Sequence, residues 1–146
     1  MSASDGLWLR MTRLFPASRA DVWRALTDPA ELARWWGPKG FAVPILDFEP
    51  ELGGSLRIAM QPPEGDRFHL DGEFREVDPP SLLSFTFRWD PPAPDDRETV
   101  VTLSIRDRGA QTQVELTQGE FATAERLSLH DEGWTESFEK LEAVLG

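Results

Sequence analysis

Residues 123–145, TAERLSLHDEGWTESFEKLEAVL, decide the fold because their pattern predicts one long amphipathic helix. The residues that recur every three or four positions would share one largely apolar face of that helix: Leu127, His130, Trp134, Phe138, Leu141 and Leu145. The opposite face would carry the charged residues Glu125, Glu132, Glu136, Glu139 and Lys140. A helix with such an apolar face must pack on another element, and the only large partner that the sequence predicts is a β-sheet.

Gly133 lies inside this predicted helix, where a glycine costs about 1 kcal/mol relative to alanine. Two interpretations of this glycine stay open. In the first, the helix bends locally at Gly133. In the second, the helix backbone comes close to another group at this position, such as a bound ligand.

The composition indicates one soluble domain over residues 1–146. The hydrophobic fraction of 40% is sufficient for a core, and the absence of cysteine excludes disulfides, thiolate metal sites and cysteine nucleophiles. The first fifteen residues lack the basic and apolar pattern of a signal peptide, and no apolar run is long enough to span a membrane. We therefore expect a cytoplasmic protein, which the lack of cysteine also fits.

The charge of the chain narrows its expected partners. With 26 acidic and 15 basic residues, the formal net charge is −11. Such a charge repels phosphate backbones, so we expect no nucleic-acid partner and no binding to anionic membranes. We expect the chain to be a monomer or a weak homodimer.

Two short helices are predicted after a first strand over residues 7–15. Ser18 and Asp21 form a capping-box pattern, in which each side chain can bond the free backbone N–H of the other residue. A second helix would start at Asp28, because this N-cap residue precedes a proline at the first helical position. We expect the second helix to carry the apolar residues Leu32, Trp35 and Trp36. It would end at Gly37-Pro38.

Six further strands are predicted from alternating polar and apolar residues: 43–48, 56–60, 67–77, 83–89, 101–106 and 114–116. Pro44 places the first of them near a sheet edge, and the short turns between strands imply antiparallel pairing. The predicted fold class is therefore α+β, in the order β-α-α-β-β-β-β-β-β-α. A curved seven-stranded antiparallel sheet would wrap around the C-terminal helix and leave an apolar cavity between them.

Several motifs along the chain resemble one known family: residues 13–18 (RLFPAS), Val22-Trp23, Thr27-Asp28-Pro29, Trp35-Trp36-Gly37-Pro38, Gly53-Gly54, Gly72, residues 76–80 (EVDPP), Gly133-Trp134 and Leu141. Together they resemble the family of activator of heat-shock-protein-90 ATPase homologues. That family lies within the START-like (SRPBCC) superfamily, which also contains the birch pollen allergen and the polyketide cyclases. The resemblance implies a helix-grip fold, which agrees with the fold that the residue patterns predict.

The same resemblance has implications for function. The family takes its name from eukaryotic co-chaperones that carry an additional N-terminal domain, and this sequence has no room for it before the first strand. Small single-domain members of the family resemble binders of apolar ligands. The resemblance therefore implies a small apolar molecule as the partner, with a chaperone partner as an alternative that the charge disfavours.

The two histidines are the only candidate bases whose ordinary pKa lies near neutral pH. His69 falls on the polar face of its strand, where we expect it to be solvated. His130 falls on the apolar face of the C-terminal helix, where it is either a structural histidine or a polar group that orients a ligand or moves a proton. Two histidines on opposite faces do not form a zinc site, and no phosphate-binding glycine motif is present. We expect no catalytic constellation, no metal and no cofactor.

The predicted function is the binding of a small apolar or amphipathic ligand between the sheet and the C-terminal helix. Its predicted binding residues come from the second helix, the sheet and the C-terminal helix: Trp36, Phe68, Leu70, Phe85, Phe87, His130, Trp134 and Phe138. Trp36 and Trp134 are the tryptophans expected to line the pocket as well as the core. The acidic segment 90–96 is either a solvated loop or a mobile rim at the cavity mouth.

Two alternatives to simple binding stay open. The first is an enzyme of the cyclase or hydratase type, in which His130 and a nearby acid would act as acid and base on a ligand in the cavity. The second is a protein-interaction module that acts on a chaperone. A single candidate base argues against the first alternative, and the absence of a basic patch argues against the second.

Overall fold

The structure is a computed structural model that describes residues 6–146. Residues 1–5, which the sequence analysis assigned to the same domain, lie outside the described residues. In chain order the elements are β1 (Leu9–Phe15), α1 (Arg19–Thr27), α2 (Pro29–Leu32), β2 (Ala42–Phe48), β3 (Ser55–Gln61), β4 (Phe68–Asp78), β5 (Leu82–Asp90), β6 (Thr99–Arg108), β7 (Gln111–Gly119) and α3 (Ala124–Leu145). This order confirms the predicted one.

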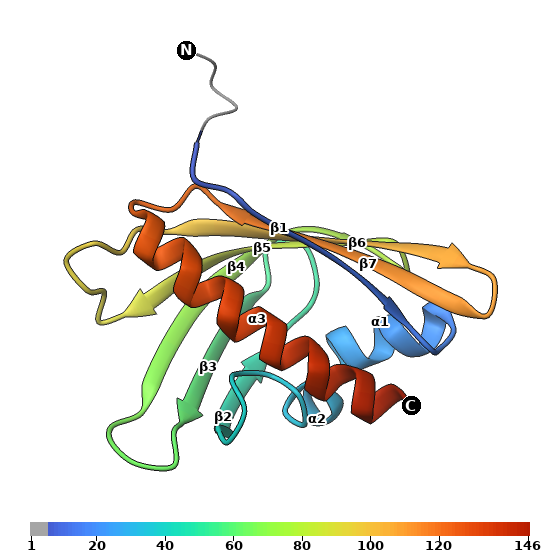
Figure 1. The fold of residues 1–146 in the computed structure, drawn as a ribbon, viewed down its shortest axis with the longest axis horizontal. Coiled ribbons are helices and arrows are strands. Elements are labelled where there is room, and N and C mark those ends of the chain that lie inside the picture. Colours follow the sequence, from blue (N-terminus) through green and yellow to red (C-terminus); the bar gives the residue numbers. More distant parts are fainter. Residues whose placement is uncertain (1–5) are drawn as a thin grey trace.

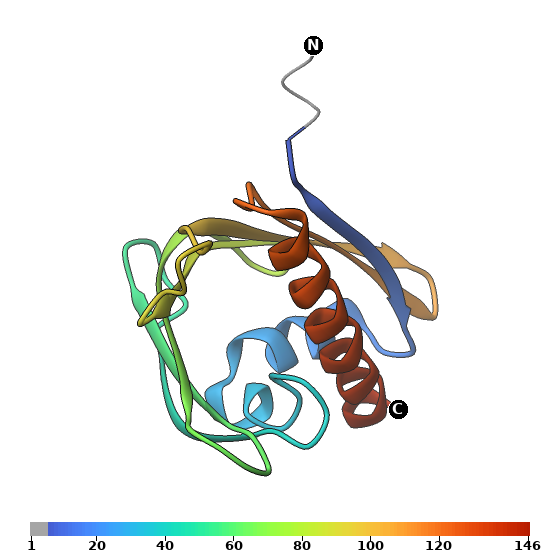
Figure 2. The ribbon, with the colours of Figure 1, turned by 60° about the vertical axis from the view of Figure 1, so that its left-hand side comes forward.

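The seven strands form one antiparallel sheet that curls around α3 (Figure 1 and Figure 2). The strand order is β1-β7-β6-β5-β4-β3-β2, so consecutive strands from β2 to β7 pair with one another and β1 pairs with β7. Pro44 lies in β2 at one edge of the sheet, where a missing backbone N–H breaks no ladder bond. The predicted α+β helix-grip fold is confirmed.

The backbones of the neighbouring strands β4 and β5 come very close at Gly72. A Cβ atom at Gly72 would lie 1.9 Å from the backbone oxygen of Thr86, so only glycine permits this approach. The hydroxyl of Thr86 also accepts a hydrogen bond from the backbone N–H of Glu73 at 2.9 Å. The pairing register of the two strands shifts between Phe74 and Glu76. This irregularity bends β4 and turns β2 and β3 toward α3.

The N-terminal helices form where the capping residues predict them. The hydroxyl of Ser18 accepts a hydrogen bond from the backbone N–H of Asp21 at 3.1 Å and caps α1. The reciprocal half of the predicted capping box is replaced by an ion pair, in which the Asp21 carboxylate lies 3.3 Å from Arg24. Asp28 caps α2 by accepting from the backbone N–H of Ala30 at 2.9 Å.

The predicted length of the second helix is wrong, because α2 ends at Leu32. The chain then turns so that Trp35 and Trp36, which are 1% and 5% exposed, both enter the core. The indole N–H of Trp35 donates to the backbone oxygen of Ala25 in α1 at 2.8 Å. Because the two consecutive tryptophans are both buried, the chain leaves the helix that the sequence pattern predicts for them.

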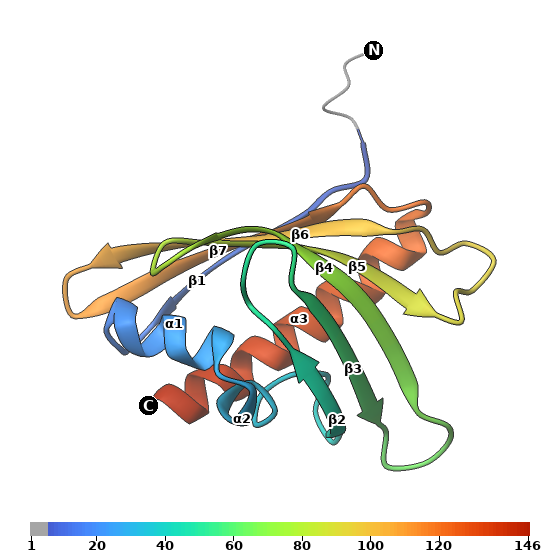
Figure 3. The same cartoon turned by 180° about the vertical axis from the view of Figure 1, so that it is seen from behind.

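Helices α1 and α2 lie beside the C-terminal half of α3 and fill one end of the space that the sheet encloses (Figure 1 and Figure 3). The ring of Phe138 in α3 packs here against Phe15 and Trp35, with ring centroids 5.6 and 6.4 Å apart. The space between the sheet and the helix is therefore filled at this end. Only the N-terminal half of α3 is left to border a cavity.

Candidate functional site

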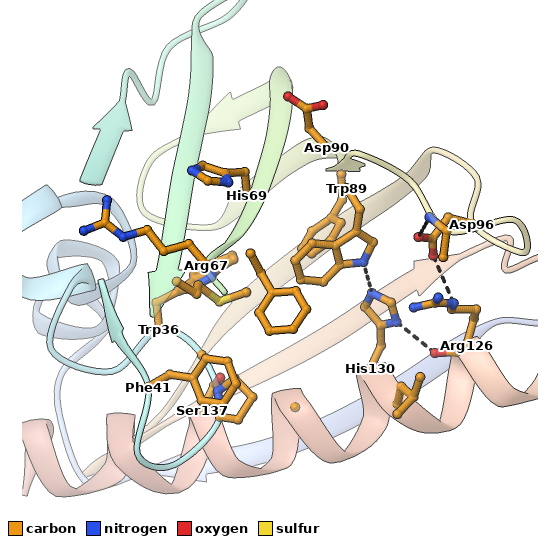
Figure 4. A pocket seen from close by; sticks show the side chains of 18 of the residues that line it. Trp36, Phe41, Arg67, His69, Trp89, Asp90, Asp96, Arg126, His130 and Ser137 are labelled. Carbon is orange, nitrogen blue, oxygen red and sulfur yellow. Dashed lines mark hydrogen bonds and ion pairs between the residues drawn. The ribbon is translucent and has the colours of Figure 1, made fainter. Parts of the chain in front are cut away.

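A cavity of about 560 Å³ lies between the N-terminal half of α3, strands β3 to β5 and the chain that follows α2 (Figure 4). Its walls are mainly aromatic and apolar: Trp36, Pro38, Phe41, Met60, Phe68, Phe87, Trp89, Leu129 and Trp134. Its margin carries charged residues: Asp66, Arg67, Asp90, Asp96 and Arg126. Two small residues of α3, Gly133 and Ser137, complete the helical wall.

Five of the eight predicted binding residues line this cavity: Trp36, Phe68, Phe87, His130 and Trp134. The other three, Leu70, Phe85 and Phe138, do not line it, and each is at most 1% exposed. Their assignment to the pocket wall is corrected here, because they belong to the closed core.

The physical reason for this correction is the aromatic packing around Trp36. Its ring centroid lies 5.2 Å from that of Trp134 and 6.5 Å from that of Phe85. Trp36 therefore covers Phe85 and separates the cavity from the filled end of the core. The sequence pattern places Phe85 on the correct face of β5 but does not show that another side chain covers it.

His130 lies on the helical wall with both ring nitrogens bonded to the protein (Figure 4). Its Nδ1–H donates to the backbone oxygen of Arg126 at 2.8 Å, and its Nε2 accepts from the indole N–H of Trp89 at 3.2 Å. The imidazole also packs against the rings of Phe87 and Phe121, with centroids 5.5 and 4.8 Å away. This arrangement requires the neutral Nδ1–H tautomer.

The environment of His130 favours that neutral form. Burial lowers the pKa of His130 from its ordinary value of 6.5, and the bond to Arg126 and the charge of Asp96 oppose the decrease only in part. With Nε2 and Nδ1 both engaged, neither nitrogen is available to anchor a ligand or to accept a proton from one. Of the roles left open for His130, the geometry favours the structural one.

Trp134 is fixed by a buried amide that the sequence analysis missed. The indole N–H of Trp134 donates to Gln118 Oε1 at 2.8 Å, and Gln118 Nε2 donates to the Thr99 hydroxyl at 2.9 Å. Gln118 is 0% exposed. The available signal was its position in β7, in phase with the buried Val114 and Leu116, where a polar residue needs a specific partner.

The acidic loop between β5 and β6 lies at the cavity margin and is tied to the start of α3. Arg126 Nε lies 3.0 Å from Asp95 and 3.1 Å from Asp96 (Figure 4). The hydrogen bond from Arg126 lowers the pKa of Asp95, and the Thr123 hydroxyl donates a further bond to Asp95 at 3.2 Å. Asp90 and Asp96 line the cavity, so this loop forms part of its rim.

The wall that contains Trp36 is held against α3 by a lysine. Lys140 Nζ donates to the backbone oxygens of Trp36, Gly37 and Pro38 at 3.3, 3.1 and 3.4 Å. Burial lowers the pKa of Lys140, and the charge of Glu136 opposes this shift. The sequence pattern predicts that Lys140 lies on the solvated face of the helix, and this prediction is wrong. The ammonium group of Lys140 reaches back to the wall of the cavity.

His69 occupies the position in β4 between the exposed Phe68 and the buried Leu70. It is half-buried, and it contributes to the cavity margin. Over residues 6–146, no group of three or more His, Cys, Asp or Glu side chains is arranged to hold a metal ion. Within the same residues, no helix has the length and apolarity needed to cross a membrane.

The curled sheet, the C-terminal helix and the enclosed cavity define a START-like protein, a class in which ligand binding is typical. A family model described as "Activator of Hsp90 ATPase homolog 1-like protein" matches residues 16–146. The chain belongs to this family, and the resemblance found in its sequence motifs is confirmed. No curated protein matches the sequence.

Solved structures agree with this assignment. A protein from Chromobacterium violaceum superposes with a TM-score of 0.87 at 24% identity, covering 94% of this chain and 96% of that one. The AHSA1 protein from Silicibacter pomeroyi has a TM-score of 0.82 at 32% identity, with coverages of 93% and 95%. CalU16 from Micromonospora echinospora, at 19% identity and a TM-score of 0.73, shares the fold, with coverages of 95% and 76%.

Proposed function

We propose that this protein binds a small apolar or amphipathic molecule in the cavity beside the N-terminal half of α3. The observation that carries the proposal is the cavity itself, about 560 Å³ in volume and walled by aromatic side chains. Pockets that bind small molecules commonly measure about 300–1,000 Å³ and are lined mainly by apolar and aromatic groups.

Two hydrogen bonds in the walls indicate a binding pocket and not an incidental hollow of the surface. Trp134 is held by Gln118 and Trp89 is hydrogen-bonded to His130, so these aromatic surfaces have defined orientations before any ligand arrives. Preorganised walls reduce the conformational entropy that binding would otherwise cost. Transfer of an apolar ligand from water to such walls contributes about 25 cal/mol per Å² of buried surface.

The proposal is binding without a catalytic step, because the candidate base does not have a free nitrogen. His130 bonds to Trp89 and to the Arg126 backbone through its two ring nitrogens. The cyclase or hydratase alternative would require His130 to release one of these partners before it could act on a ligand. The function is therefore assigned to the shape and apolarity of the cavity.

The Gly133→Leu variant tests this proposal. A Cβ atom at Gly133 would meet no atom within 4 Å, so a larger side chain can enter the cavity without displacing the core. We expect the variant to fold and to bind the hydrophobic fluorophore 1-anilinonaphthalene-8-sulfonate at least about tenfold more weakly, a loss of about 1.4 kcal/mol. Native mass spectrometry of the freshly purified wild type should also detect a bound small molecule that Gly133→Leu lacks.

A matched control is Ala143→Leu, which adds a similar side chain at an exposed position of the same helix. Its affinity for the fluorophore should equal that of the wild type. Equal binding by the wild type, Gly133→Leu and Ala143→Leu would place the fluorophore outside the cavity and contradict the proposal.

A further inference from the structure

The inner wall of the cavity presents two polar groups that the protein does not use. The Ser137 hydroxyl and the Trp36 indole N–H have no hydrogen-bond partner among residues 6–146, although these residues are only 4% and 5% exposed. The other polar groups of the inner wall differ. Trp134, Trp89 and His130 all bond to protein atoms.

These two groups are open to the cavity. In the described part of the chain, every side-chain nitrogen or oxygen that is inaccessible to solvent has a hydrogen-bond partner. An unpartnered group on a nine-tenths buried side chain must therefore face open space, and both residues line the cavity. A ligand that displaces water from these two groups has to supply a hydrogen-bond acceptor in its place, or their hydrogen bonds are lost.

The helical wall beside these groups carries two small residues. Gly133 and Ser137 are one turn apart on the same face of α3, and neither projects a bulky side chain. The aromatic residues Phe68, Phe87 and Trp89 line the cavity from β4 and β5. The room that the two small residues leave opposite aromatic rings suits a planar ring system, which can pack against those rings.

The charges around the cavity indicate whether the hydrogen-bond acceptor of a ligand at the inner wall is charged or neutral. The lining cations are Arg67 and Arg126 at the margin, and Arg126 is already paired with Asp95 and Asp96. Lys140 directs its ammonium group to three backbone oxygens behind Trp36. A carboxylate at the inner wall would lose water without gaining a counter-ion, which costs much more than the burial of a neutral oxygen.

We propose that the ligand is a planar, ring-containing apolar molecule with an uncharged oxygen, a carbonyl or hydroxyl, that accepts hydrogen bonds from the Ser137 hydroxyl and the Trp36 indole N–H at the inner wall. This inference rests on the proposed function, because it concerns the same cavity. It adds the chemical class of the ligand and assigns a binding role to Ser137.

The test compares two probes that differ by one oxygen, 9-fluorenone and fluorene. Both are planar tricyclic molecules, and only 9-fluorenone carries a carbonyl oxygen. We expect the wild type to bind 9-fluorenone about four- to a hundredfold more tightly than fluorene, as measured by quenching of tryptophan emission, because each of the two net hydrogen bonds contributes about two- to tenfold.

Two variants identify the groups responsible for this preference. Ser137→Ala and Trp36→Phe each remove a donor, so each should reduce the ratio of the 9-fluorenone affinity to the fluorene affinity, and this ratio is read separately from any change in wall contact that affects both probes. Thr135→Ala is the matched control, since it removes a hydroxyl that bonds to Asp131 on the outer face of the same helix. It should leave both affinities unchanged.

Flexible chains test the planar part of the proposal. Decanol carries a hydroxyl oxygen but no ring, and we expect it to bind more weakly than 9-fluorenone. Tighter binding of decanol would show that the cavity selects chains over rings and would overturn this part of the proposal.

The experiment separates failure of this inference from failure of the proposed function. Equal binding of 9-fluorenone and fluorene, with both blocked by Gly133→Leu, would overturn the hydrogen-bonding assignment and keep the cavity as the binding site. An oxygen preference that survives in both Ser137→Ala and Trp36→Phe would also overturn the assignment. Binding of both probes that survives in Gly133→Leu would contradict the proposed function as well.

Discussion

Two glycines show how one residue type meets opposite demands in this molecule. Gly72 is required because the backbone of β5 passes too close to β4 for any side chain, with Thr86 as the nearest contact. Gly133 lies in a regular helix beside open space, where nothing in the protein excludes a side chain. Gly133 lines the cavity, so under the proposed function its backbone would lie beside the ligand, as in the second of its two interpretations.

The same substitution at these two sites should therefore change stability in opposite directions. Gly72→Ala places a Cβ 1.9 Å from a backbone oxygen, and we expect a loss of at least about 1–3 kcal/mol in the free energy of unfolding. Gly133→Ala should raise it by about 1 kcal/mol, because alanine favours the helix. Urea unfolding followed by tryptophan emission measures both, and a stabilising Gly72→Ala would show that the strands are farther apart than described.

His130 should make the folded protein sensitive to mild acid. Burial lowers its pKa from 6.5, so below that pH the unfolded chain binds a proton that the folded protein resists. The free energy of unfolding should be unaffected by His130 above pH 6.5 and should fall as the pH decreases below it, down to the pKa of the folded state. Protonation would also force Nε2–H against the Trp89 N–H.

The His130→Phe variant isolates this contribution. It keeps an aromatic ring against Phe87 and Phe121 and removes the titration. We expect the wild type to lose stability relative to the variant between pH 7.5 and pH 5, as measured by urea unfolding at each pH. Parallel pH profiles would mean that the folded protein accommodates the imidazolium as well as the unfolded chain does.

At the level of elements, the wall after α2 depends on α3 for its position. Three residues of α3 contact this segment: Lys140 bonds to the backbone oxygens of residues 36–38, Glu136 accepts from the Lys39 backbone N–H at 2.8 Å, and Glu139 pairs with the Lys39 ammonium at 3.0 Å. These polar contacts hold the segment against α3 in addition to the packing of Trp36 on Trp134. Any ligand that contacts Trp36 depends indirectly on Lys140.

The Lys140→Met variant should show how much the bonds from Lys140 to the backbone oxygens of residues 36–38 contribute, compared with an ordinary charged residue on the surface. We expect the variant to lose about 1–3 kcal/mol of unfolding free energy, since a charged donor shared by three carbonyl oxygens is removed. Hydrogen exchange of the backbone amides in residues 36–41 should also become faster.

Lys39→Met is the matched control, because its ion pair with Glu139 is exposed, with side chains 60% and 46% accessible. Exposed pairs of this kind contribute about 0–1 kcal/mol. Equal effects of Lys39→Met and Lys140→Met on stability and exchange would show that the three carbonyl contacts do not position the wall.

At the level of the whole molecule, α3 supports both the core and the cavity. Its C-terminal half buries Phe138 and Leu141 in the end filled by α1 and α2, and its N-terminal half carries His130, Gly133 and Trp134 on the cavity. One helix thus borders both the packed half of the interior and the half that holds the cavity.

Truncation before Thr123 should abolish folding. The helix removes Trp134, Phe138 and Leu141 from water, and each such side chain contributes about 1.5–3 kcal/mol. A domain of this size has only about 5–15 kcal/mol of net stability. We expect the truncated chain to show no cooperative thermal transition by circular dichroism. A transition near the temperature of the full chain would contradict the central role assigned to α3.

The sequence alone determined the fold and part of the site. Element types, their order and the helix caps at Ser18 and Asp28 depend on residues a few positions apart, so local patterns were sufficient to predict them. The inward face of β5 and the apolar face of α3 followed from the same periodicity. Three of the residues predicted for the pocket, Phe87, His130 and Trp134, lie on its wall for this reason.

Only the tertiary structure decided which inward-facing residues border the cavity. Phe85 and Phe87 have the same periodicity, yet Trp36 covers the first and leaves the second on the wall. The contacts that make this choice, such as Lys140 with the Trp36 backbone and Trp134 with Gln118, join residues 104 and 16 positions apart in the chain. A periodic pattern shows which face a side chain occupies, whereas its exposure depends on what the rest of the folded chain places above it.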